Sequence, residues 1–81
     1  MDREQLKILI LKDLKDGQEP KYQELDVDKN LFGEVVENME ESGLIKNSSV
    51  VRGGMGNVVQ MAFLNHARIT DFGLRYLEQN N

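Results

Sequence analysis

The stretch LIKNSSVVRGGMGNVVQMAFL at residues 44–64 decides the fold, because here the apolar pattern changes from helical spacing to the spacing of strands. The β-branched or alternating runs Val50-Val51 and Val58-Val59-Gln60-Met61 flank a glycine-rich cluster, GGMGN, at residues 53–57. Glycine adopts positive φ angles without strain, as the tight turn of a hairpin requires. The stretch therefore predicts a β-hairpin over about residues 47–64 with a glycine-rich tip.

Helices are expected on both sides of this hairpin, over about residues 3–16, 20–26, 29–42 and 71–79. In the first of them Leu6, Ile10 and Leu14 recur every four residues, which places them on one helix face. Pro20 suits the first turn of the short second helix, because its fixed φ angle is already helical. The expected capping residues are Asp28 and Thr70 at helix starts and Gly17 and Gly43 at helix ends.

Three helices, a hairpin and a closing helix predict a winged helix-turn-helix fold of the α+β class. The three-helix core would carry the β-hairpin as its wing, over about residues 44–64, followed by the C-terminal helix. Gly73 in that last helix would allow close packing, because it has no side chain. A length of 81 residues suits a single domain spanning 1–81.

Composition excludes several function classes. The chain has no cysteine and one histidine, so thiolate and histidine-rich metal sites are not expected. The loop Gly53-Gly54-x-Gly56 lacks the Lys-Ser/Thr pair of a phosphate-binding loop, and His66 has no acidic residue within four positions. The sequence thus predicts no cofactor, no metal and no enzymatic activity. It also has neither a long apolar run nor a signal peptide, so a cytoplasmic protein without membrane contact is expected.

Three segments, LKILILKDLKDG (6–17), FGEVVENMEESGLI (32–45) and ITDFGLRYLEQN (69–80), resemble the YjcQ-like family of small, often prophage-associated winged-helix proteins. The resemblance covers nearly the whole chain. Its most specific part is Ile69-Thr70-x-x-Gly73-x-x-Tyr76-Leu77, an ending shared with many winged helices. It implies a cytosolic bacterial or phage protein of winged-helix fold, without any established ligand or reaction to carry over.

Basic residues are concentrated in and around the predicted wing. Residues 44–70 hold Lys46, Arg52 and Arg68 and no acidic residue, a net charge of +3 within a chain of net −4. These three side chains are the candidates for contact with the phosphates or minor groove of double-stranded DNA. The alternative is that they are solvated charges on an exposed hairpin, because three cations contribute little to DNA affinity.

The third predicted helix has the opposite charge. Its apolar stripe would leave a common exposed face of Asn30, Gly33, Glu34, Glu37, Glu40 and Glu41. Carboxylates near phosphates are repelled, which disfavours docking of this helix in the major groove. Such a face is either a solvated surface or a patch that binds a basic protein, for which Glu34, Glu37, Glu41 and the wing-tip Met55 are the candidate residues.

Two functions follow as hypotheses. The first is a DNA-binding protein, a transcriptional regulator or accessory factor that contacts DNA mainly through the wing. The alternative is a protein–protein adaptor that uses the acidic third helix and binds no DNA. Ile8, which lies among Glu4, Lys12 and Lys15 on the opposite side of the first helix, indicates a second packing partner. A dimer mate is one such partner, so a homodimer is a further hypothesis.

Overall fold

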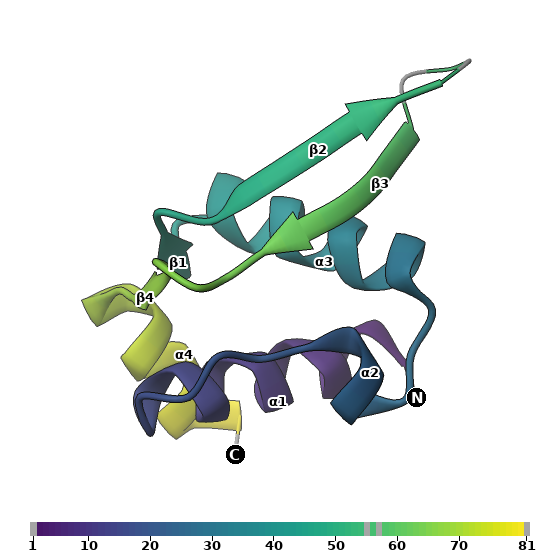
Figure 1. Ribbon diagram of the computed structural model, residues 1–81. Helices are drawn as coiled ribbons and strands as arrows, with labels where there is room; N and C mark the ends of the chain where they lie inside the picture. Colours follow the sequence, from purple (N-terminus) through teal and green to yellow (C-terminus); the bar gives the residue numbers. More distant parts are fainter. Residues whose placement is uncertain (1, 55, 57, 81) are drawn as a thin grey trace.

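Four helices and two antiparallel sheets make up an α+β fold in the part of the chain that the structure describes (Figure 1). The computed structural model describes residues 2–54, 56 and 58–80, apart from the side chains of Val58 and Gln60. The elements are α1 (Arg3–Lys15), α2 (Tyr22–Leu25), α3 (Lys29–Glu41), β1 (Ile45–Lys46), β2 (Ser49–Gly53), β3 (Val58–Phe63), β4 (Arg68–Ile69) and α4 (Asp71–Asn80). The predicted α+β class is confirmed.

The expected caps of α3 are confirmed. At its start the Asp28 carboxylate accepts hydrogen bonds from the backbone N–H groups of Asn30 and Leu31, at 3.0 and 3.1 Å. At its end Gly43 has a φ of +82°, and the N–H of Leu44 donates to the Met39 carbonyl at 2.9 Å. These bonds satisfy backbone groups that a helix leaves unpaired at its ends, so local sequence determines where α3 begins and stops.

The short helix α2 begins later than the sequence suggested. Residues 18–21 are irregular, and Lys21 is the N-cap but makes no side-chain capping bond. Pro20 does not open the helix; its ring is fully buried instead. The expectation that Pro20 occupies the first helical turn is therefore wrong, because its ring packs into the interior ahead of the helix.

The predicted β-hairpin is confirmed as the antiparallel pair β2 and β3. Val50 pairs with Ala62 and Val51 with Met61, after which the register shifts by one residue so that Arg52 pairs with Val59. In the loop Gly54 and Gly56 have φ angles of +71° and +84°, as the glycine cluster predicted. Met55 and Asn57, the other two loop residues, lie outside the described residues.

A second ladder, between β1 and β4, was not expected. It pairs Ile45 with Ile69 and Lys46 with Arg68. Immediately after it, the Thr70 hydroxyl donates to the Gly43 carbonyl at 2.6 Å and accepts from the Gly73 N–H at 2.9 Å, which confirms Thr70 as the N-cap of α4. A Cβ on Gly73 would lie 2.1 Å from the Leu44 carbonyl oxygen, so glycine is what permits this close approach. The start of α4 is thus held against the end of α3.

Helix α3 lies between the β2–β3 hairpin and α1 (Figure 1). The buried apolar residues of α3 meet those of α1 in one contiguous core, which β1, β4 and α4 close at one end. The core residues are Leu6, Ile10, Leu11, Phe32, Val35, Val36, Met39, Leu44, Ile45, Leu64, Ala67 and Leu77. Among the described residues, no helix has the length and apolar character needed to cross a membrane.

Candidate interaction surface on helix α3

The hairpin covers one side of α3 that was expected from the sequence to be exposed. The Asn30 side-chain amide donates to the Val59 carbonyl at 2.7 Å, and Asn30 is partly buried. Gly33 is buried, and a Cβ there would lie 2.4 Å from Cγ1 of Val59. The expectation that Gly33 shares an exposed face with the glutamates is therefore wrong. Helical periodicity identifies an apolar stripe, but it cannot show where a later hairpin will pack.

The accessible strip of α3 consists of Glu34, Asn38 and Glu41, which are all exposed and follow one another at helical spacing. We call these three residues the α3 strip. Glu34 accepts a hydrogen bond from the Arg3 guanidinium at 2.9 Å, and both side chains remain about half exposed, at 46% and 59%. Glu41 forms no ion pair with any described residue. The strip is thus an amide flanked by two solvent-accessible carboxylates.

Glu37 and Arg52 form an ion pair between α3 and β2. The Arg52 guanidinium donates to the Glu37 carboxylate, and their side chains are 37% and 27% exposed. Arg52 reaches α3 because it pairs with Val59, on the face of the hairpin that covers the helix. One candidate for DNA contact and one candidate for partner binding therefore neutralise each other within the fold.

Glu40 has a structural role at the start of the hairpin. Its carboxylate accepts hydrogen bonds from the backbone N–H of Ser48 at 2.8 Å and from the Ser48 hydroxyl at 2.5 Å. This contact ties the last turn of α3 to the residue preceding β2. The sequence placed Glu40 on a common acidic face, and the structure gives its carboxylate a partner within the chain.

The three basic candidates do not gather in one place. Lys46 and Arg68 are directly opposite each other in the β1–β4 ladder, and both are exposed. Neither forms an ion pair with a described residue. Arg52 lies in a different ladder, one residue before Gly53 at the end of β2 that leads into the hairpin tip. The structure thus places two of the three cations side by side. Met55, the remaining candidate for partner binding, lies outside the described residues.

An apolar groove beside the hairpin was missed at the sequence level. It lies between β3 and residues 19–23, has a volume of about 250 Å³, and includes Tyr22, Phe32 and Met61 in its lining. Phe63 at its edge is 46% exposed, and Val51 on the neighbouring strand is 45% exposed. Alternation along β2 and β3 could have indicated these outward positions, because neighbouring residues of a strand point to opposite faces.

Two titratable groups near α1 have shifted pKa values. The hydrogen bond from the Tyr76 hydroxyl to the Glu4 carboxylate, together with burial and the charge of Glu4, raises the pKa of Tyr76 to about 12. Burial, followed by repulsion from Glu24 and Asp16, raises the pKa of Asp13. Within the described residues no group of acidic or histidine side chains is placed to hold a metal ion. Both shifts arise from contacts and charges around α1.

The fold and its surface define a small α+β domain with an acidic helical strip between a β-hairpin and a helical layer. A family model described as YjcQ protein matches residues 8–81, which is most of the chain. The chain belongs to the YjcQ family. No curated protein and no solved structure is significantly similar to it.

Proposed function

We propose that this chain is a winged-helix-like domain that acts as a protein-interaction module, with the α3 strip as its contact surface for a basic protein. The order of three helices, a hairpin and a closing helix supports the winged-helix comparison. The observation that carries the function is the environment of α3. One flank is covered by the hairpin, and the accessible strip carries two carboxylates, of which Glu34 is paired with the half-exposed Arg3.

This environment argues against reading DNA with α3. A recognition helix lies against phosphates, which attract cations and repel carboxylates. Glu34 and Glu41 would have to lie in that field, and the nearest hairpin cation, Arg52, already pairs with Glu37. A basic protein surface suits the strip better, since arginine and lysine side chains of a partner could reach both carboxylates.

The ion pair between Arg3 and Glu34 within the chain supports this proposal. It shows that a guanidinium reaches the strip from outside α3 and hydrogen-bonds there while half exposed. Exposed pairs of this kind contribute little to stability, about 0–1 kcal/mol. A partner that supplies several cations together could therefore replace Arg3 at small cost to the fold.

A photo-crosslinking side chain at position 38 tests the proposal in the intact protein. We expect it to capture a basic protein in the host cell, and the variant Glu34→Lys, Glu41→Lys to lose that capture. The control Glu24→Lys, Glu78→Lys makes the same change in net charge at exposed positions away from the strip, and should retain it. Equal capture by both double variants would refute the assignment of the strip.

Double-stranded DNA binding at the β1–β4 ladder is the second candidate function. Lys46 and Arg68 lie opposite each other without an ion-pair partner among the described residues, and like charges in such a pair favour a bound anion. Two phosphate contacts give a salt slope of only about −1.8. Fluorescence anisotropy with duplex DNA at low salt tests this. Binding should be lost in Lys46→Gln, Arg68→Gln and kept in Arg52→Gln, and undetectable binding of the native chain rules it out.

A further inference from the structure

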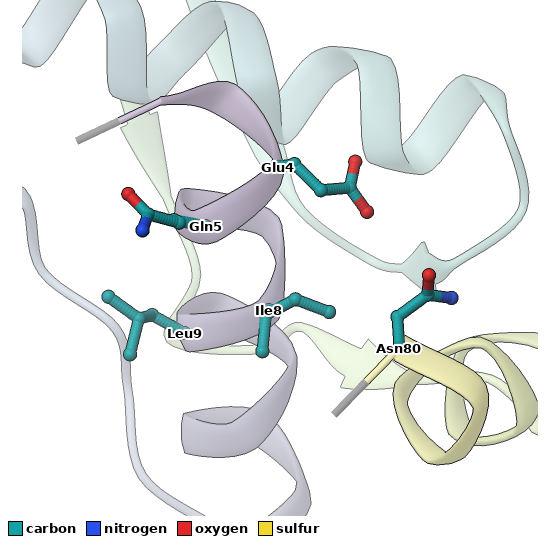
Figure 2. A pocket seen from close by; sticks show the side chains of 5 residues that line it. All are labelled: Glu4, Gln5, Ile8, Leu9 and Asn80. Carbon is teal, nitrogen blue, oxygen red and sulfur yellow. The ribbon is translucent and has the colours of Figure 1, made fainter.

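Two grooves of the described surface differ in how their apolar side chains are arranged. One has a volume of about 420 Å³ and is formed by α1 together with the end of α4. There Ile8 points toward Asn80, while Leu9 projects to the other side of α1, so these apolar side chains offer a ligand no common contact (Figure 2). The groove between β3 and residues 19–23, of about 250 Å³, is better enclosed and takes its walls from three separate parts of the chain. We call it the β3 groove.

The β3 groove runs along the open edge of β3. Its lining includes the three consecutive strand residues Met61, Ala62 and Phe63, but none of the described residues of β2. Because neighbouring residues of a strand point to opposite faces, a groove on one face of the hairpin would be lined by every second residue. Consecutive lining residues indicate instead the edge of the strand, on the side away from β2. Residues 19–23 form the opposite wall, and Phe32 of α3 completes the apolar lining.

This edge of β3 has backbone groups without a strand to pair with. Among the described strands β3 pairs with β2 alone, and the register is regular over residues 61–63, where every second residue therefore directs its N–H and C=O away from β2. No backbone hydrogen bond joins residues 61–63 to a described residue outside this ladder. Nearer the tip, the Val59 carbonyl accepts from the side-chain amide of Asn30 at 2.7 Å, so one amide from outside the ladder already pairs with β3. The groove thus adjoins donors and acceptors that suit an additional strand.

The charge and size of the groove favour an uncharged, extended occupant. Glu19 and Lys21 are exposed on either side of the buried Pro20, so their opposite charges leave this wall without net charge. The volume is below the range of about 300–1,000 Å³ that is typical of pockets for small molecules. A second copy of β3 could not pair here, because each copy carries its own wall of residues 19–23 beside this edge. An extended segment of another protein has no such wall, and it supplies the backbone groups that the edge lacks.

We propose that the open edge of β3 binds an extended, uncharged segment of a partner protein as a third strand, with an apolar side chain of that segment in the β3 groove. In this mode of recognition, main-chain hydrogen bonds provide affinity and side-chain pockets provide selectivity. No residue of the α3 strip lines the groove, and the bound segment differs in charge from the basic protein proposed for that strip. The site is therefore independent of the proposed function, and Glu34→Lys, Glu41→Lys should leave its affinity unchanged.

Selection from a displayed library of random linear peptides tests the site in the native chain. We expect the selected peptides to carry alternating apolar residues. Their dissociation constant should increase at least about tenfold in Phe63→Glu, which places a charge at the edge of the groove. Val51→Glu is the matched control, because Val51 lies on β2 outside the groove lining and is 45% exposed, against 46% for Phe63. Circular dichroism confirms that both variants fold. If no linear peptide is selected, or if both variants bind it equally well, the proposal is wrong.

N-methylation of the selected peptide tests the strand pairing itself and requires no change in the protein. A paired segment directs every second N–H toward β3, so methylating one alternate set of amides should weaken binding at least about tenfold, whereas methylating the other set should not. Equal effects of the two sets would mean that the peptide docks without joining the sheet, and would overturn the proposal. Sedimentation of the native chain covers the remaining occupant, because self-association that the peptide abolishes would assign this edge to a second copy instead.

Discussion

Gly33→Ala probes directly whether the hairpin rests on α3. A methyl group at this position would lie 2.4 Å from Cγ1 of Val59 but 3.6 Å from its Cβ. The first distance is far inside van der Waals contact, and the second is an ordinary contact. The clash therefore depends on one methyl group of Val59, which a second substitution can remove.

Two opposing effects determine the size of the change. Alanine is favoured over glycine in a helix interior by about 1 kcal/mol. Overpacking of a tight contact costs about 1–3 kcal/mol. Gly33→Ala should therefore lower the free energy of unfolding by about 0–2 kcal/mol in the native background. In a Val59→Ala background the clash is absent, so the same change should raise the free energy of unfolding by about 1 kcal/mol.

Urea denaturation of the four proteins, followed by circular dichroism, measures this double-mutant cycle. The expected coupling energy between positions 33 and 59 is about 1–3 kcal/mol, which exceeds the scatter of additive, distant pairs. If Gly33→Ala is equally stabilising in both backgrounds, the hairpin does not contact α3 at Gly33. The hairpin would then leave this face of α3 uncovered and accessible to a DNA groove.

Four further predictions follow from individual contacts and charges elsewhere in the fold. Asp28→Ala should lower the free energy of unfolding by about 1 kcal/mol in urea denaturation, whereas Asp28→Asn, which keeps an acceptor, should lose little. Gly73→Ala should destabilise in every background, because its clash is with a backbone carbonyl that no side-chain change relieves; a neutral result would contradict the packing of α4. The raised pKa of Tyr76 contributes stability that is present below the pKa of an unfolded tyrosine, about 10, and is lost as the pH rises through about 12. The native chain should thus lose more melting temperature between these pH values than Tyr76→Phe, and parallel losses would show that the bond to Glu4 is absent. For Asp13, whose raised pKa disfavours the charged form, Asp13→Asn should raise the melting temperature at neutral pH and lose this advantage in acid below its unfolded pKa.

Local chemistry explains why much of the fold could be predicted. Asp28, Gly43 and Thr70 act through bonds to backbone groups a few residues away, so their roles follow from neighbouring sequence. The hairpin follows similarly from two β-branched runs and a glycine-rich turn. The β1–β4 ladder could not be predicted in this way. It pairs two residues with two others more than twenty positions later, too few for a pattern of their own.

In the candidate site, too, local sequence predicted the residue types but not the contacts between distant residues. The sequence predicted an acidic helix and a basic hairpin. The acidic residues lie on α3, but only Arg52 of the three predicted cations lies on the β2–β3 hairpin, whereas Lys46 and Arg68 pair in the β1–β4 ladder.

The sequence treated Arg52 and Glu37 as available to different partners, although they are fifteen residues apart and form an ion pair with each other. It also counted Glu40 on an open acidic face, although its carboxylate binds Ser48. Only the path of the hairpin over α3 brings these groups together.

By itself, the sequence determined the helix limits at Asp28, Gly43 and Thr70, the hairpin, and the acidic character of α3, because each depends on residue types within a few positions. The tertiary structure decided which carboxylates of α3 remain accessible and which cations lie side by side. These properties depend on how whole elements pack, and packing is set by contacts between residues distant in sequence, such as Gly33 with Val59. Side-chain chemistry is therefore local, whereas its accessibility is a property of the assembled fold.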